Sequence, residues 1–484
     1  MRNSLRNATF SACLVAVTAN GCDRVVVPES APTPSSTELA PLLEASSATA
    51  DANDDAGGAP ENGPAAENSS VAEHEPLGPV AFFLVRQKGW VVLTDSGFAE
   101  VPDATTSSNF SDGFQRFRGR LVGLGYEDWF ELRPEGISQA TDIPKIDDPP
   151  KSSWTTAPDG SIWTLSPGKV AHLVDAAWKT VEFDPELPDD VLYTGIAVDA
   201  DGEPWVATGK AIFRRKENAW VRVSFPGSRE AVYLEGLTHS PRGDIYLPSG
   251  DSIFLLGDSP TRVKLKSNGR SRLSAIKFVT SSEGELFALA HGIEGVSLFL
   301  PEEKSRFIRG GKKLNLNFIT ESAVDGQGRV WLSGDAGLAV AALDGTMTSY
   351  PSGSVELIAG KLKSIIILGD GPPLPSVSGE IATGSLSGAI SRDGVPLAQA
   401  RVEICASPSG VFTRSPCAGR LRRFKGKTDE AGRFLFADVP LGSYGIAIKT
   451  GRSWRLSIFP TLGARMKSGE TSDIGTLNID TEED

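Results

Sequence analysis

The sequence predicts an all-β protein with two folded domains, a β-propeller followed by a small β-sandwich. A glycine turn and a short apolar strand recur at intervals of 41 to 44 residues through the middle of the chain. A second series of strands, punctuated by Gly and Pro, follows near the C-terminus. We therefore expect the propeller over residues 79–370, a linker over 371–384 and the sandwich over 385–479.

The repeat unit is a turn that ends in glycine and leads into an apolar strand, often with an aromatic residue at the third position after the glycine. Asp201-Gly202-Glu203-Pro204-Trp205 is one instance. Glycine suits such a turn because it tolerates positive φ. The spacings between successive turn glycines are 41, 42, 41, 41 and 44 residues, as expected for four-stranded propeller blades. The turn glycines are Gly119, Gly160, Gly202, Gly243, Gly284 and Gly328.

The two ends of the array predict a seventh, composite blade. Ala81–Phe83 and Trp90–Leu93 copy the spacing of the third and fourth strands of a blade. Val355–Ile358 and Leu362–Leu368 then supply its first and second strands. This interpretation favours seven blades, while a ring of six blades and a different division of the N-terminal strands both stay open.

The order "apolar strand, Asp-x-x-Gly-x-hydrophobic-Trp, strand" resembles the propeller repeats in periplasmic sensor regions of two-component regulators. The resemblance covers about residues 80–370. It implies a fold and leaves the function open, because propellers host many unrelated tasks.

The C-terminal domain shows strands with period two, such as Tyr444, Ile446 and Ile448 on one face. The motifs around Asp393-Gly394 and Asp429-Glu430-Ala431-Gly432 precede this strand in order. The series is similar to the carboxypeptidase regulatory-like family, a prealbumin-like sandwich. In that family the domain is an accessory module, so the resemblance implies no catalytic role.

Cys405 and Cys417 lie between two of these strands and are expected to form a disulfide. The alternative, a metal pair, needs further Cys or His ligands, and no histidine follows His291. We expect no metal and no cofactor.

The N-terminus reads as an export signal over residues 1–22. Arg2 and Arg6 precede a short, mostly apolar stretch. Thr18-Ala19-Asn20-Gly21-Cys22 resembles the lipobox of bacterial lipoproteins, although Ala19 stands where Leu is usual. Lipidation of Cys22 would also avoid a lone thiol in an oxidising compartment. The resemblance implies an anchor in the bacterial envelope, with cleavage after Ala19 and free secretion as the alternative.

Residues 23–78 are expected to form a disordered acidic tether. They contain no Phe, Trp or Tyr, and eleven Asp or Glu against one Arg. The tail at 480–484 holds four more acids. Most of the net charge of −13 therefore belongs to the tether and tail, and the two folded domains are expected to be close to neutral.

One basic cluster with an aromatic residue inside it lies in the sandwich. It suggests contact with an anionic envelope polymer. The alternative is an edge strand whose charges prevent pairing with other chains. No nucleic-acid partner is expected. The basic residues are Arg420, Arg422, Arg423, Lys425 and Lys427.

The histidines do not suggest a catalytic centre. His172, His239 and His291 lie 12 after, 4 before and 7 after their local turn glycines, and His74 lies in the tether. Side chains that converge on the central channel of a propeller should lie at similar distances from the turn glycine in their different blades. Streptogramin-lyase-like propellers carry paired histidines near a glutamate, a grouping that this sequence does not show.

We therefore expect a lipid-anchored binding or scaffolding protein without catalytic residues, whose propeller face binds a glycan, a peptide or a partner protein. An envelope enzyme with a propeller active site is the alternative. A ligand sensor acting through a separate membrane partner is a third possibility.

Overall fold

The computed structural model describes residues 78–479 with gaps. The residues outside the description within that span are 87, 103–112, 126–127, 147–152, 184–192, 210, 225–235, 250–251, 264–272, 281–285, 293–294, 300–304, 310–315, 317–318, 335–336, 377–378, 407–414, 419, 421, 452 and 458–465. Cys22, residues 23–77 of the predicted tether and the acidic tail lie outside the described residues.

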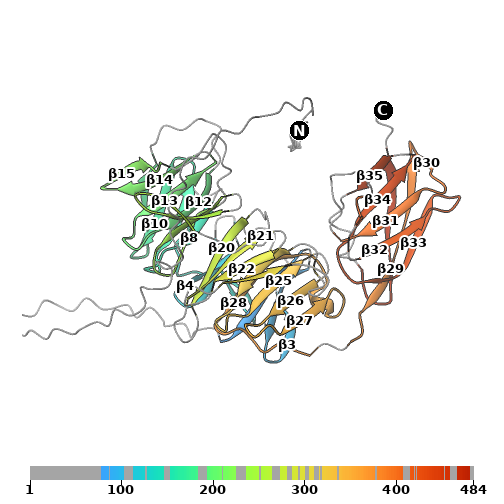
Figure 1. Ribbon diagram of the computed structural model, residues 1–484, viewed down its shortest axis with the longest axis horizontal. Helices are drawn as coiled ribbons and strands as arrows, with labels where there is room; N and C mark the ends of the chain where they lie inside the picture. Colours follow the sequence, from blue (N-terminus) through green and yellow to red (C-terminus); the bar gives the residue numbers. More distant parts are fainter. Residues whose placement is uncertain are drawn as a thin grey trace, which may run out of the picture. The chain divides into compact units, whose positions relative to one another are not determined.

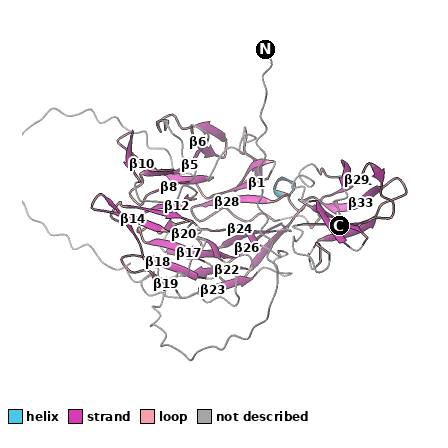
Figure 2. Cartoon of the chain, turned by 90° about the horizontal axis from the view of Figure 1, so that it is seen from above, coloured by secondary structure: helices cyan, strands magenta, loops and turns pink. Residues whose placement is uncertain are grey.

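Nearly all of the regular structure is β-strand, which confirms the predicted fold class (Figure 2). Among the described residues, seven four-stranded antiparallel sheets form the propeller blades. The first blade consists of β28 (Leu362–Leu368), β1 (Val80–Val85), β2 (Gly89–Thr94) and β3 (Gly97–Glu100), and the second of β4 (Phe114–Phe117), β5 (Arg120–Leu124), β6 (Trp129–Arg133) and β7 (Gly136–Gln139). The third blade consists of β8 (Ser153–Thr156), β9 (Ile162–Ser166), β10 (Lys169–Val174) and β11 (Ala177–Glu182). The fourth consists of β12 (Tyr193–Val198), β13 (Pro204–Thr208), β14 (Ile212–Lys216) and β15 (Ala219–Arg222).

The other three blades follow in chain order. They are β16 (Thr238–His239), β17 (Ile245–Ser249), β18 (Ser252–Leu256) and β19 (Thr261–Val263); β20 (Leu273–Thr280), β21 (Leu286–Gly292), β22 (Gly295–Phe299) and β23 (Ser305–Arg309); β24 (Ile319–Val324), β25 (Val330–Gly334), β26 (Gly337–Ala341) and β27 (Met347–Pro351).

The first blade is composite, as expected, but its division differs from the prediction. β28 pairs antiparallel with β1, so strands from both ends of the array lie side by side (Figure 1). The N-terminal segment supplies three strands because Gly97, at φ 107°, closes a hairpin that adds β3. The stretch predicted as a further strand holds the 3₁₀ turn η3 (Glu356–Ile358).

Apolar clusters between adjacent blades hold the propeller together. Trp331 and Leu338 of the last blade pack with Phe83 of the composite blade, for example, and Trp205 packs with Leu247 of the next blade. Burying large aromatic side chains is strongly stabilising, about 25 cal/mol per Å² of apolar surface removed from water. This packing joins blades that the local turn motifs alone would leave separate.

The C-terminal domain is a sandwich of two four-stranded sheets. One has the order β30-β29-β33, with β36 parallel to β29, and the other has the order β32-β31-β34-β35. Their inner faces share one core, which includes the predicted Tyr444, Ile446 and Ile448. The strands are β29 (Thr383–Arg392), β30 (Val395–Pro396), β31 (Arg401–Cys405), β32 (Arg423–Lys427), β33 (Arg433–Pro440), β34 (Gly445–Thr450), β35 (Ser453–Ser457) and β36 (Thr471–Ile479).

Within the described residues, no helix is long and apolar enough to span a membrane.

Candidate functional site

The repeated aromatic residue has a structural role in the blade turns. The carboxylate of Asp325 accepts hydrogen bonds from the indole Nε1 of Trp331 at 2.8 Å, from Arg329 Nε at 2.7 Å and from two backbone N–H groups of the turn. Asp199 accepts an equivalent bond from Trp205 Nε1 at 2.9 Å. Burial raises the pKa of Asp325, and these hydrogen bonds oppose the shift. These two carboxylates therefore fix the conformation of their turns.

The turn glycines serve the same local geometry. Gly243 has a φ of 87°, and a Cβ on it would lie 2.2 Å from the backbone nitrogen of Ala200 in the neighbouring blade. Gly284 lies outside the described residues. The other turn glycines with positive φ are Gly119, Gly160, Gly202 and Gly328.

Polar side chains on the innermost strands connect neighbouring blades. Gln115 on β4 donates from Nε2 to the carbonyl of Trp154 at 2.9 Å. Arg116 on the same strand donates to the carbonyl of Ile367 on β28 at 3.3 Å. These bonds use the side chains to hold the blades against one another.

Two side chains on the innermost strands of adjacent blades occupy the same position relative to the turn glycine of their own blade, as expected of residues that line a propeller channel. Lys277 of β20 and Glu321 of β24 each lie seven residues before a turn glycine. Their Nζ and Oε2 atoms are 3.5 Å apart, and Lys277 also donates to the carbonyl of Ser322 at 2.6 Å. Burial raises the pKa of Glu321, while Lys277 opposes that shift. The histidine pattern gives no indication of this pair, but the equal distance of both residues from a turn glycine is visible in the sequence.

The three described histidines lie in three different strands, at different distances from the turn glycine of their blade. His172 is on β10, where its ring lies 4.3 Å from that of Trp163. His239 is on β16; burial lowers its pKa to about 4, and its buried Nδ1 has no hydrogen-bond partner among the residues that the structure describes. His291 is on β21, and His74 lies outside the described residues. Among the described residues, no group of three or more His, Cys, Asp or Glu side chains could hold a metal ion.

The predicted disulfide between Cys405 and Cys417 is present, with a Cα–Cα distance of 5.7 Å. Both cysteines are fully buried and pack against Ala447 on the outer face of β34. The bond therefore holds the segment after β31 against this sheet.

The basic cluster divides into residues with different roles. Arg423 donates to both carboxylate oxygens of Glu403, at 2.8 and 2.9 Å, and Arg422 donates to the carbonyl of Ser352 at 2.7 Å. Arg420 is half-buried, whereas Lys425 and Lys427 are exposed on β32. β32 is an edge strand, as the alternative interpretation of the cluster requires, in which the charges prevent the strand from pairing with other chains.

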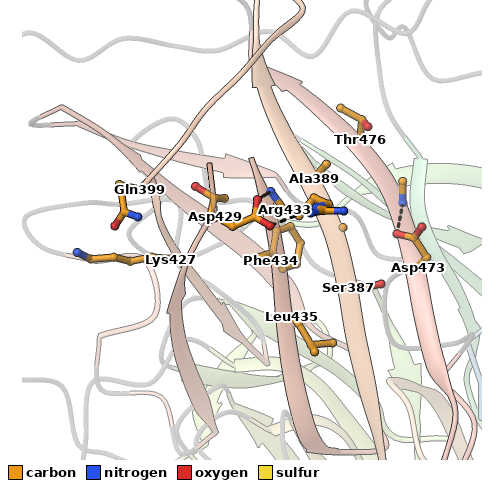
Figure 3. Close-up of a pocket in the computed structure, with 13 residues that line it drawn as sticks. Ser387, Ala389, Gln399, Lys427, Asp429, Arg433, Phe434, Leu435, Asp473 and Thr476 are labelled. Atoms are coloured by element: carbon orange, nitrogen blue, oxygen red, sulfur yellow. Dashed lines mark hydrogen bonds and ion pairs between the residues drawn. The ribbon is translucent and has the colours of Figure 1, made fainter. Parts of the chain in front are cut away.

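A hollow of about 700 Å³ lies on the outer face of the other sheet of the sandwich (Figure 3). Ser387 forms its floor between Leu435 of β33 and Asp473 of β36, its direct partners on the two neighbouring strands. Ala389 occupies the same position one step along, between Arg433 and Thr476. Small side chains on the central strand, flanked by longer ones, make the hollow.

The walls of the hollow carry opposite charges and one apolar group. Asp429 and Arg433 form an ion pair on one side, with Lys427 near them, and Asp473 lies on the opposite wall (Figure 3). A bulge in β36 places Asp473 and Thr476 opposite Ser387 and Ala389. The side chain of Leu435 is 63% exposed at the edge. The hollow can therefore offer hydrogen bonds, charges of both signs and an apolar contact.

No family model matches the chain, and no curated protein matches it. Solved structures show distant similarity. A catalytically inactive virginiamycin B lyase from Staphylococcus aureus, solved with quinupristin, is 12% identical and aligns over 49% of this chain and 83% of its own, with a TM-score of 0.38. The extracellular domain of a putative one-component system from B. thetaiotaomicron is 11% identical over 78% of this chain and 60% of its own, with a TM-score of 0.39. A protein of unknown function from Bacteroides caccae is 9% identical over 60% and 98%, with a TM-score of 0.31.

Proposed function

We propose that this protein is a binding or scaffolding protein of the bacterial envelope, exported and anchored by a lipid at Cys22. Its sandwich holds an extended peptide segment of a partner protein in the hollow above Ser387 and Ala389, and its propeller is a rigid platform that offers a second contact face. The observation that supports this proposal is the hollow, because concave surfaces with a few convergent polar groups are the usual ligand sites of proteins.

The chemistry of the walls favours a peptide as the occupant. A peptide carries apolar side chains, charges of both signs and backbone hydrogen-bonding groups, and the hollow has a counterpart for each. Leu435 meets an apolar side chain, Arg433 a carboxylate and Asp473 an ammonium or guanidinium group. The hydroxyl of Ser387 on the floor is placed to bond a peptide group.

The disulfide supports export. Disulfides persist in oxidising compartments and are rare in the reducing cytosol, so a buried bond between Cys405 and Cys417 fits a protein that folds outside the cytoplasm. It also fits the resemblance of the N-terminus to a lipobox.

The peptide proposal is tested with a phage-displayed library of random peptides selected on the full mature chain. Ala389→Trp fills the floor of the hollow, whereas Val395→Trp places the same side chain on a residue that is 66% exposed and does not line it. We expect selected peptides to lose at least about tenfold in affinity for the first variant and to bind the second as they bind the wild type. Equal binding to all three proteins would overturn the proposal.

The anchor is tested separately with Cys22→Ser. The wild type should fractionate with membranes and carry a lipid on its N-terminal cysteine by mass spectrometry, whereas the variant should be released. A wild-type protein without lipid at Cys22 would refute the anchor and leave the hollow untouched.

A second candidate function rests on the pair of Lys277 and Glu321. A carboxyl group with a raised pKa beside a lysine, in one register of adjacent blades, is a combination that a propeller enzyme could use for proton transfer. A panel of chromogenic esters, glycosides and β-elimination substrates tests it. Turnover by the wild type that Glu321→Gln abolishes, without loss of thermal stability, would favour this candidate over the binding role.

A further inference from the structure

The outer face of the sheet β32-β31-β34-β35 carries a concentration of positive charge. Val402 and Ile404 of β31 point into the core, so Arg401 and Glu403 of the same strand point outward. Beside one acidic residue, Glu403, the strands place five basic residues on this face, since Arg455 pairs with the core residue Ile448 and faces the other way. The five basic residues are Arg401, Arg423, Lys425, Lys427 and Lys449.

Three of these side chains form a row across adjacent strands. Arg401 of β31 pairs directly with Lys427 of β32 on one side and with Lys449 of β34 on the other. Directly paired residues point to the same face, and neighbouring strands are about 4.8 Å apart. The next residue in the row is Trp454 of β35, which pairs with Lys449. The guanidinium carbon of Arg401 lies 5.9 Å from the centre of the Trp454 ring.

The one carboxylate on this face pairs with Arg401 but leaves the two lysines of the row without a partner among the described residues. Glu403 is fully buried and is held by both nitrogen donors of Arg423 and by the hydroxyl of Ser415. Arg401 lies 3.4 Å from it. Within the described residues, Lys427 and Lys449 have no carboxylate within ion-pair distance. Like charges directly opposite one another in a sheet are destabilising, so folding stability does not explain this arrangement.

Protection of an edge does not explain it either. Charges on an edge strand prevent pairing with other chains, and that argument covers Lys425 and Lys427 on β32. Arg401 and Lys449 are on the two interior strands of the sheet, which have no free edge.

We propose that the row formed by Lys427, Arg401 and Lys449 is a binding site for an anionic polysaccharide with one carboxylate or phosphate per repeating unit. The polymer crosses the strands so that each of the three cations binds one of its anionic groups. The bound anions reduce the electrostatic repulsion between the three cations. Arg401 and Lys449 lie on the opposite sheet from the hollow and outside its lining, whereas Lys427 lines both sites. The single variant Lys449→Gln therefore separates this site from the peptide site proposed above.

A glycan fits this face better than a membrane surface does. Membrane-binding surfaces combine cations with apolar side chains that enter the bilayer. Here the aromatic candidate, Trp454, is half-buried, packs beside the disulfide and is covered on one side by Arg401. The charges are instead in a line, which suits an extended polymer.

The test uses the full mature chain and polygalacturonate, which carries one carboxylate per sugar. The double variant Lys427→Gln/Lys449→Gln removes two charges from the row. The control Lys216→Gln/Arg222→Gln removes two exposed charges from β14 and β15 of the propeller. We expect the row variant to lose at least about tenfold in affinity and the control to stay within about twofold, with all binding weakened by salt.

The outcomes separate this proposal from the alternatives. Because the row variant relieves repulsion, it should unfold at the same temperature as the wild type or higher, so a loss of binding will not reflect unfolding. Equal binding by the row variant and the control would overturn the site. Binding to phosphatidylglycerol vesicles but not to polygalacturonate would overturn the choice of ligand. Ala389→Trp should leave polygalacturonate binding unchanged even where it abolishes peptide binding.

Discussion

Arg423 and Glu403 form a two-point ion pair across neighbouring strands of the sandwich, with N–O distances of 2.9 and 2.8 Å. Burial opposes ionisation of Glu403, but the hydrogen bonds from Arg423 and Ser415 outweigh it and lower the pKa of the carboxyl. The pair therefore stabilises the fold at neutral pH, and its contribution disappears as the pH falls through this lowered pKa.

Arg423→Ala should destabilise the sandwich by about 2–3 kcal/mol, because it removes two charged hydrogen bonds from the buried Glu403 carboxylate and leaves only Ser415 and the longer contact with Arg401. Lys425→Ala, two residues along the same strand face and exposed, should change stability by less than about 0.5 kcal/mol. Hydrogen exchange of β31 amides measures the effect, with propeller amides as the internal reference. Equal exchange in the two variants would contradict the role of the pair.

The disulfide should contribute about 2–3 kcal/mol by restricting the unfolded chain over its separation of 12 residues. The double variant Cys405→Ala/Cys417→Ala should lower the urea midpoint of the sandwich and leave the propeller transition in place. Addition of a reducing agent to the wild type should give the same shift. A midpoint unaffected by either change would show that packing alone holds this segment.

The blade turns differ in how much their acidic residues contribute. Asp325→Ala should cost about 3 kcal/mol, because it removes the acceptor of the buried indole of Trp331, of Arg329 Nε and of two backbone N–H groups of the turn. Asp159→Ala removes an exposed carboxylate that bonds only Ser161 among the described residues, and should cost under about 1 kcal/mol. Thermal unfolding of both variants measures the two losses of stability. A larger loss in Asp159→Ala than in Asp325→Ala would contradict the prediction.

His239 predicts acid sensitivity of the propeller. Burial lowers its pKa to about 4, below the ordinary value of 6.5, so the unfolded chain binds a proton more readily than the folded chain. Stability is therefore lost as the pH falls from about 6.5 toward 4, by at most about 3 kcal/mol. His239→Gln should flatten this part of the pH profile, measured by urea unfolding. An unchanged slope would assign the acid sensitivity to other groups.

Much of the fold could be read from the sequence because its determinants are local. A blade is a series of hairpins between consecutive segments, and residues such as Gly202 and Trp205 mark each turn within a few positions. The register of Lys277 and Glu321 could have been read in the same way, from their common distance to the turn glycines. The division of the composite blade could not, because β3 is short and half-exposed and has no strong apolar pattern.

The repeat, the two β domains, the cysteine pair and the segment rich in basic residues are all evident in the order of the amino acids. Which of those cations act together depends on how the strands are arranged in space. Arg401, Lys427 and Lys449 are more than twenty residues apart in the chain, and they form one row because the sheet order places β31 between β32 and β34. The same order pairs Arg423 with Glu403 and removes it from the exposed charge. Cross-strand neighbours depend on topology and register, which no local pattern of residues specifies.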